Sequence, residues 1–299
     1  MTPRLPQPGI KPMLKNNILV HEKKAKLGES EMKENRISDL PNCLILCILS
    51  LLTYKDAVRT CILSRRWEHL WKFLPTLVLH ESDFRTKKIF NKVLPKLLSF
   101  RDPSFALQTL DFKGFGIVEP HILKRVISYA ISHEVQQLAI EANVNFNRLP
   151  PIIFSSIFFC ETLTYLKLSV VNKDEKMVFP KSLNLPALTS LNLWNIHFIA
   201  SENGHADPFK TLKKLNNLVL YDCTATGLRF YISSTTLLSL AICQKSYGIC
   251  EFWLSTPNLC SFALEGGFYP RIYGTILSSV NRVNVADILH SCSKPPLLC

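Results

Sequence analysis

One apolar spacing recurs through most of the chain and restricts its fold more than any other feature. The template is an apolar residue, two others, an apolar residue, one other, and a third apolar residue. It occurs eight times, with its middle apolar residue at these positions: Leu110, Leu138, Leu166, Leu191, Leu218, Leu240, Phe262 and Val283. Successive middle residues are 21 to 28 positions apart. Such self-similarity indicates stacked units, each too small to bury its apolar face alone.

Within each unit, the second and third apolar residues have the spacing of side chains on one face of a β-strand. In the unit that begins at Leu163, for example, Leu166 and Leu168 point to the core, while Tyr165 and Lys167 point to the other face. A period of about 20–29 residues is that of leucine-rich repeats. The sequence therefore predicts an α/β fold, a leucine-rich-repeat solenoid whose parallel strands form a curved sheet. Turns and short helices are expected on its back.

Side chains that point away from the core on these strands are the candidates for ligand binding. We predict a target-binding surface that contains Lys167, Asn192, Trp194 and Tyr221. Exposed aromatic side chains are enriched where proteins bind partners. The alternative is that Trp194 and Tyr221 pack on neighbouring loops, and the sequence leaves both readings open.

Residues 36–74 carry a different pattern, which predicts three short helices. The candidate N-caps are Ser38 or Asp39, Thr53 and Ser64. The first helix is apolar on two adjoining faces, made by Leu44, Ile45, Ile48, Leu49, Leu51 and Leu52. A unit this small is marginally stable alone, so both faces are expected to be covered. Either the downstream domain covers both, or a partner protein covers one.

This segment resembles an F-box, through Leu40-Pro41, the stretch Lys55 to Arg59 and the stretch Leu63 to Trp67. Followed by irregular leucine-rich repeats, it is similar to the plant family of F-box/leucine-rich-repeat proteins. The resemblance implies that the F-box docks on a Skp-type adaptor, and through it on a cullin-RING ligase. It assigns the adaptor contact to Leu40, Pro41, Leu44, Ile48, Leu49, Leu52, Val58, Leu63 and Trp67.

The implied function is substrate recognition in an SCF-type ubiquitin ligase, with the repeats holding an unidentified protein target. The alternative is a non-catalytic repeat scaffold that no longer recruits a ligase. We expect a flexible basic leader at 1–32, the F-box at 33–76, leucine-rich repeats at 77–290 and an unstructured tail at 291–299. No cap is visible after the faint eighth repeat, so we expect a short or truncated family member.

Composition and motifs limit the other classes of function. The net charge of +12 is dispersed along the chain, so a nucleic-acid partner is not expected, although a basic solenoid that binds nucleic acid is a third hypothesis. The ten cysteines show no Cys-x-x-Cys pairing, so we expect reduced thiols and no metal site.

Catalytic and membrane roles are not expected either. We find no phosphate-binding glycine motif, no Gly-x-Ser-x-Gly and no His-Glu-x-x-His, and therefore predict no catalytic residue and no cofactor. No apolar run reaches the roughly 18 residues that a membrane helix needs. We expect a protein of the nucleus or cytoplasm.

Overall fold

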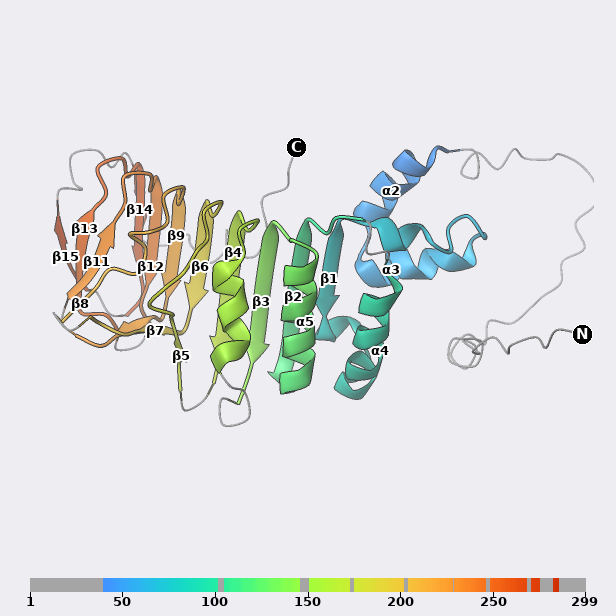
Figure 1. The fold of residues 1–299 in the computed structure, drawn as a ribbon, viewed down its shortest axis with the longest axis horizontal. Helices are drawn as coiled ribbons and strands as arrows, with labels where there is room; N and C mark the ends of the chain where they lie inside the picture. The colour runs from blue at the N-terminus through green and yellow to red at the C-terminus, as the bar shows by residue number, and fades with distance from the viewer. Residues whose placement is uncertain are drawn as a thin grey trace, which may run out of the picture. The chain divides into compact units, whose positions relative to one another are not determined.

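The computed structural model describes residues 40–101, 105–145, 151–172, 175–201, 204–227, 229–245, 248–267, 270–274 and 282–284 (Figure 1). The predicted leader, the candidate caps Ser38 and Asp39, and the predicted tail lie outside the described residues. The helical elements are α2 (Asn42–Ser50), α3 (Tyr54–Arg59), α4 (Lys87–Phe100) and α5 (Pro120–Ser132), with 3-10 segments η1 (Thr60–Ile62), η2 (Leu70–Phe73), η3 (Glu81–Asp83) and η4 (Pro151–Phe159).

The α2 helix has one buried and one exposed apolar face. It follows Pro41, whose carbonyl oxygen accepts hydrogen bonds from the amides of Leu44 and Ile45 at 3.0 and 3.2 Å. Ile45 and Leu49 are fully buried, and α2 packs on η2. Of the two apolar faces predicted from the sequence, the one with Ile45 and Leu49 thus meets the core, and the one with Leu44 and Ile48 is exposed.

The second predicted cap is confirmed, and the third predicted helix is only partly present. The Thr53 hydroxyl accepts a hydrogen bond from the Asp56 amide at 3.2 Å and caps α3. After Ser64 the chain makes turns and then the short 3-10 segment η2, in place of one α-helix. The indole N–H of Trp71 donates to the carbonyl oxygen of Glu68 at 3.0 Å, which stabilises the tighter path.

A nine-stranded sheet forms the main body, in the order β1-β2-β3-β4-β6-β9-β12-β14-β16. Its strands are β1 (Thr76–His80), β2 (Thr109–Ile117), β3 (Gln137–Asn143), β4 (Tyr165–Val171), β6 (Ser190–Trp194), β9 (Asn217–Tyr221), β12 (Ser239–Cys243), β14 (Ser261–Glu265) and β16 (Arg282–Asn284). All neighbouring strands are parallel, and the middle apolar residues of the template lie opposite one another in register. The parallel sheet predicted from the apolar spacing is confirmed.

The apolar rows of this sheet form the core. Helices cover them in the first half of the chain, where α4 and α5 pack together and α5 contacts η4 (Figure 1). Phe90 of α4 meets Phe112 of β2 with ring centroids 6.0 Å apart. The other face of the sheet carries the residues that we predicted to point away from the core.

In the second half of the chain, short strands lie behind the main sheet, where turns and short helices were expected. One small sheet has the order β10-β7-β5 and another the order β15-β13-β11-β8. Their strands are β5 (Met177–Val178), β7 (Ile196–Phe198), β8 (His205–Ala206), β10 (Thr224–Ala225), β11 (Arg229–Ser233), β13 (Glu251–Ser255) and β15 (Arg271–Gly274). Phe198, Phe230 and Phe252 contact one another edge to face through this layer, with successive ring centroids 4.9 and 5.4 Å apart. A second β layer thus takes the place of the expected turns and short helices.

Candidate functional site

The outer face of α2 is an exposed apolar surface. Leu44, Ile48, Leu51 and Leu52 are 48%, 41%, 85% and 41% exposed. Each of the buried residues Ile45 and Leu49 of α2 directly follows one of the exposed residues Leu44 and Ile48. Isolated apolar residues are common at protein surfaces, but here Leu44 and Ile48 of α2 and the next two residues after its end at Ser50 are all exposed, and a group of exposed apolar residues is typical of protein-binding sites. We call these four residues the α2 face.

The residues assigned to adaptor contact by resemblance do not all lie at the surface. Pro41, Leu44, Ile48, Leu52 and Leu63 are exposed, and Leu40 and Val58 are half-buried. Leu49 and Trp67 lie in the interior, at 0% and 5% exposure. They position the helices from inside and present no docking surface.

Two exposed apolar residues were absent from that assignment. Leu51 is the most exposed large apolar residue of the α2 face, and Ile62 in η1 is 74% exposed. Leu51 belongs to the apolar run predicted for the first helix, and this run could have placed Leu51 among the docking residues. The start of α2 is held by Arg66. Its guanidinium donates two hydrogen bonds to the side-chain oxygen of Asn42, at 2.9 and 2.8 Å.

Three of the four predicted target-binding residues come together on the polar face of the main sheet. Trp194 and Tyr221 lie opposite each other on β6 and β9, and their rings stack with centroids 4.1 Å apart and an interplanar angle of 14°. The Lys167 ammonium lies 5.5 Å from the Trp194 ring centroid, and the Lys245 ammonium lies 5.2 Å from that of Tyr221. We call Lys167, Trp194, Tyr221 and Lys245 the stacked row.

The fourth predicted residue, Asn192, has a structural role in the same face. It is only 8% exposed, and its side-chain amide donates to the hydroxyl of Tyr165 at 3.1 Å. Lys245 was not among the predicted target-binding residues, because it lies in the loop after β12 and outside the strand pattern. A hydrogen bond with the Tyr221 phenol raises the pKa of Lys245, so this lysine is a cation at the end of the row.

Ion pairs continue the polar face toward the first strands. Glu141 accepts from Lys113 at 2.8 Å and lies 3.9 Å from the Lys167 ammonium. His80 and Asp111 are 3.1 Å apart on β1 and β2. This hydrogen bond raises the pKa of His80 above its ordinary value of 6.5. Charges on this part of the face therefore neutralise one another.

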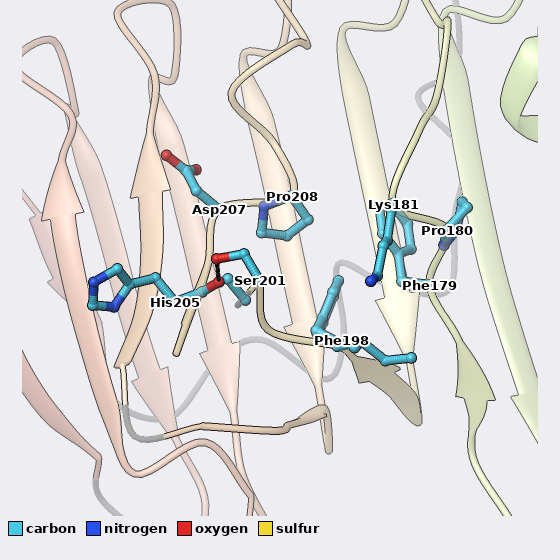
Figure 2. Close-up of a pocket in the computed structure, with 10 residues that line it drawn as sticks. Phe179, Pro180, Lys181, Phe198, Ser201, His205, Asp207 and Pro208 are labelled. Carbon is cyan, nitrogen blue, oxygen red and sulfur yellow. Dashed lines mark hydrogen bonds between the residues drawn. The ribbon is translucent and has the colours of Figure 1, made fainter. Parts of the chain in front are cut away.

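A small pocket of about 190 Å³ lies behind the main sheet, near β7 and β8. Figure 2 shows Lys181 and Asp207 on different sides of it. Burial raises the pKa of the Asp207 carboxyl. The Ser201 hydroxyl donates to the main-chain oxygen of His205 at 2.9 Å, so this hydroxyl is not paired with the imidazole as a nucleophile would be.

Within the part of the chain that the structure describes, no group of three or more His, Cys, Asp or Glu side chains has the arrangement of a metal site. None of the described helices has the length and apolar character needed to cross a membrane.

Comparison with known proteins identifies a domain family over the segment that contains α2. The F-box domain family matches residues 37–79, which contain α2, α3, η1, η2 and nearly all of β1. A putative F-box/LRR-repeat protein of Arabidopsis thaliana is 27% identical, over 91% of this chain and 64% of the relative. A putative FBD-associated F-box protein of the same plant is 32% identical, over 87% of this chain and 56% of the relative.

F-box/LRR-repeat protein 13, also from Arabidopsis thaliana, is 32% identical over 52% of this chain and 34% of its own length. This chain thus spans roughly a third to two-thirds of the length of these curated relatives. No solved structure matches it. The predicted resemblance is confirmed: residues 37–79 form an F-box domain, and the homologues of this chain are F-box/LRR-repeat proteins of Arabidopsis.

Proposed function

We propose that this chain is the substrate-recognition subunit of an SCF-type ubiquitin ligase. The α2 face docks a Skp-type adaptor, which connects the chain to a cullin and a RING protein. The polar face of the main sheet binds a protein target. The chain itself is non-catalytic, because the partner enzymes transfer ubiquitin.

The α2 face is the single observation that carries this proposal. Its four residues are exposed, whereas Ile45 and Leu49 of α2 are fully buried. Leaving such a surface in water is unfavourable, at about 25 cal/mol for each Å² of apolar area. Within the described chain, nothing covers this apolar face. The face lies in the segment that matches the F-box domain, and F-box domains generally bind Skp-type adaptors. Both observations support a Skp-type adaptor as the partner.

The main sheet is the concave surface of a leucine-rich-repeat solenoid in this proposal. In leucine-rich repeats, an Asn or Cys follows three residues after the third leucine of the template. One repeat of this chain has that full pattern, with Leu215, Leu218, Leu220 and Cys223. Burial raises the pKa of Cys223 to about 12, so the thiol keeps its proton. It donates to the carbonyl oxygen of Leu193 in the preceding repeat at 3.6 Å, and such a bond joins neighbouring repeats.

The stacked row supports the target-binding role of the polar face. Each ring of Trp194 and Tyr221 has one face on the other ring and a lysine ammonium near it. The rings are therefore held in place before a target arrives, and a preorganised aromatic anchor loses little entropy on binding. Tryptophan and tyrosine are enriched among the residues that contribute most of the binding energy at protein interfaces.

Tethering is the physical basis of the activity in this proposal. A target held on the sheet and a ubiquitin donor held through the adaptor react at a high effective concentration, without a catalytic residue in this chain. The specificity of ubiquitination then depends on which proteins fit the polar face.

Co-purification with a Skp-type adaptor tests the proposal. Ile48→Glu puts a charge on the α2 face, and Ile89→Glu is the matched control, because Ile48 and Ile89 are 41% and 43% exposed. We expect the wild type and Ile89→Glu to retain the adaptor and Ile48→Glu to lose it. Wild-type protein that is folded and retains no Skp-type adaptor would contradict the ligase role and leave a repeat scaffold.

A further inference from the structure

Two cysteines lie on the exposed side of α2. Cys43 and Cys47 are both exposed free thiols, and with Leu51 they are spaced one helical turn apart. On an α-helix, residues four apart form a row along one side. This row lies next to the α2-face row of Leu44 and Ile48.

Helical geometry places the two thiols away from the protein core. At about 100° per residue, Cys47 is roughly opposite the midpoint between the buried residues Ile45 and Leu49. Within the part of the chain that the structure describes, neither thiol of Cys43 or Cys47 makes a hydrogen bond. Both sulfur atoms are therefore accessible to a reagent in solution.

The other described cysteines are held differently. Cys160, Cys223 and Cys243 are buried. Cys61 is partly covered, and burial raises the pKa of its thiol, which lowers the fraction of reactive thiolate.

Two more cysteines are exposed but lie outside the F-box. The thiols of Cys250 and Cys260 donate to the carbonyl oxygens of Gly248 and Asn258 at 3.8 and 3.4 Å. They stand in the C-terminal half of the chain and supply a matched comparison for exposed thiols that are not on α2.

We propose that Cys43 and Cys47 are a modification site for small disulfides, such as glutathione disulfide, and that the adduct prevents adaptor docking. The site rests on the exposure of the thiols, and the effect on docking rests on the function proposed above. In the reaction, a cysteine loses its proton to water and its thiolate attacks one sulfur of the small disulfide. The S–S bond of that disulfide breaks, a protein–glutathione S–S bond forms, and the other half leaves as a thiolate.

A mixed disulfide is favoured over a bond between the two cysteines. On a helix, the Cβ atoms of residues four apart are about 5–6 Å from each other. A disulfide needs a Cβ separation of about 3.5–4.5 Å. Closing Cys43 on Cys47 would distort α2, whereas each cysteine can carry an adduct without moving the backbone.

The adduct changes the chemistry of the docking surface. Glutathione adds a peptide with a net negative charge to an apolar surface, and its charged groups would have to lose their water on docking. Its bulk also separates the α2 face from a partner. Excess thiol reverses the reaction, so docking follows the redox state of these two residues.

The test uses the full chain and glutathione disulfide, with peptide mapping by mass spectrometry and adaptor binding measured before and after treatment. We expect adducts on Cys43 and Cys47 and adaptor binding weakened by at least about tenfold, with recovery after dithiothreitol. Cys43→Ala/Cys47→Ala should bind the adaptor before and after treatment, since alanine keeps the helix and the apolar character. Cys250→Ala/Cys260→Ala should respond like the wild type.

The possible outcomes separate this inference from the proposed function. The absence of adducts on both α2 cysteines would overturn the modification site, whatever the adaptor does. Adducts on both residues with unchanged adaptor binding would overturn the effect on docking. Reduced wild-type protein that fails to bind the adaptor would instead refute the proposed function, while the mapping would still decide whether the thiols react.

Discussion

Leu49 in α2 and Leu51, the residue directly after α2, offer a sharp prediction, because the same substitution should affect stability at one position and docking at the other. Leu51 is 85% exposed and Leu49 is fully buried. If the α2 face docks a Skp-type adaptor, Leu51→Ala should weaken binding and leave the fold nearly unchanged. Leu49→Ala should destabilise the fold, since its side chain fills the interior.

The magnitudes follow from the exposed fractions. Burying a leucine side chain completely is worth about 1.5–3 kcal/mol, and Leu51 has most of its surface still to bury. Since alanine keeps part of that surface, we expect Leu51→Ala to cost about 1–2 kcal/mol of docking, or roughly 5- to 30-fold in Kd. Its effect on unfolding should stay within about 0.5 kcal/mol. Leu49→Ala should cost about 2–5 kcal/mol of stability.

The assay is a titration of each variant with the adaptor, alongside thermal unfolding followed by circular dichroism. Leu51→Ala should keep the wild-type unfolding midpoint and bind more weakly. Leu49→Ala should unfold at a midpoint lower by roughly 4–20 °C. If Leu51→Ala binds with the wild-type Kd and is equally stable, the α2 face is not the docking surface and the reasoning is refuted.

Three other predictions concern the sheet. A double-mutant cycle with Trp194→Ala and Tyr221→Ala, measured by chemical denaturation, should give a coupling energy of about 0.5–1.5 kcal/mol, and strict additivity would contradict the stacking. Because Asp111 raises the pKa of His80 above 6.5, this pair stabilises the fold fully below that value and loses its effect as the pH rises through the higher folded pKa. Asp111→Asn should therefore destabilise more at about pH 6 than at about pH 9, and equal losses would refute the pairing. Gly266→Ala should lower the unfolding midpoint, since its φ is +119° and a methyl group there would overlap main-chain atoms of the loop after β12; the adjacent glycine, with open space around it, is the control.

The register of the main sheet could be predicted from sequence because strand periodicity ties the apolar residues to one face. Leu166, Leu191 and Leu218 are separated by unequal lengths of chain, yet they lie opposite one another on β4, β6 and β9. A shift of one residue would turn each apolar row toward water. The length of the connections therefore has no influence on the register.

The layer behind the sheet could not be predicted in the same way. Strands of two residues, such as β5, β8 and β10, carry no periodicity. The alternation in β11, with Phe230 and Ile232 buried, is a strand signal, but it stands within a connection where helices and turns were expected.

The candidate site shows a similar division. Both sides of α2 are apolar in sequence, so periodicity could not say which one faces the core, and packing against η2 decides it. The aromatic pair Trp194 and Tyr221 could be anticipated from strand parity. The contribution of Lys245 could not, because it extends from a loop and its direction depends on tertiary structure.

The junction between α2 and the sheet bears on how a ligase of this kind would select lysines on its target. Tyr54 of α3 contacts Trp71 of η2 edge to face, with centroids 5.9 Å apart, and the buried Leu74 leads to β1, which begins at Thr76. No flexible linker separates the F-box helices from the first strand, in contrast to tethers whose effective concentration falls as the linker lengthens. In the proposed ligase, a target bound to the polar face would therefore be held at a fixed position relative to the adaptor. Which target lysines receive ubiquitin would then depend on that fixed geometry, because the rigid junction keeps the target from moving relative to the adaptor.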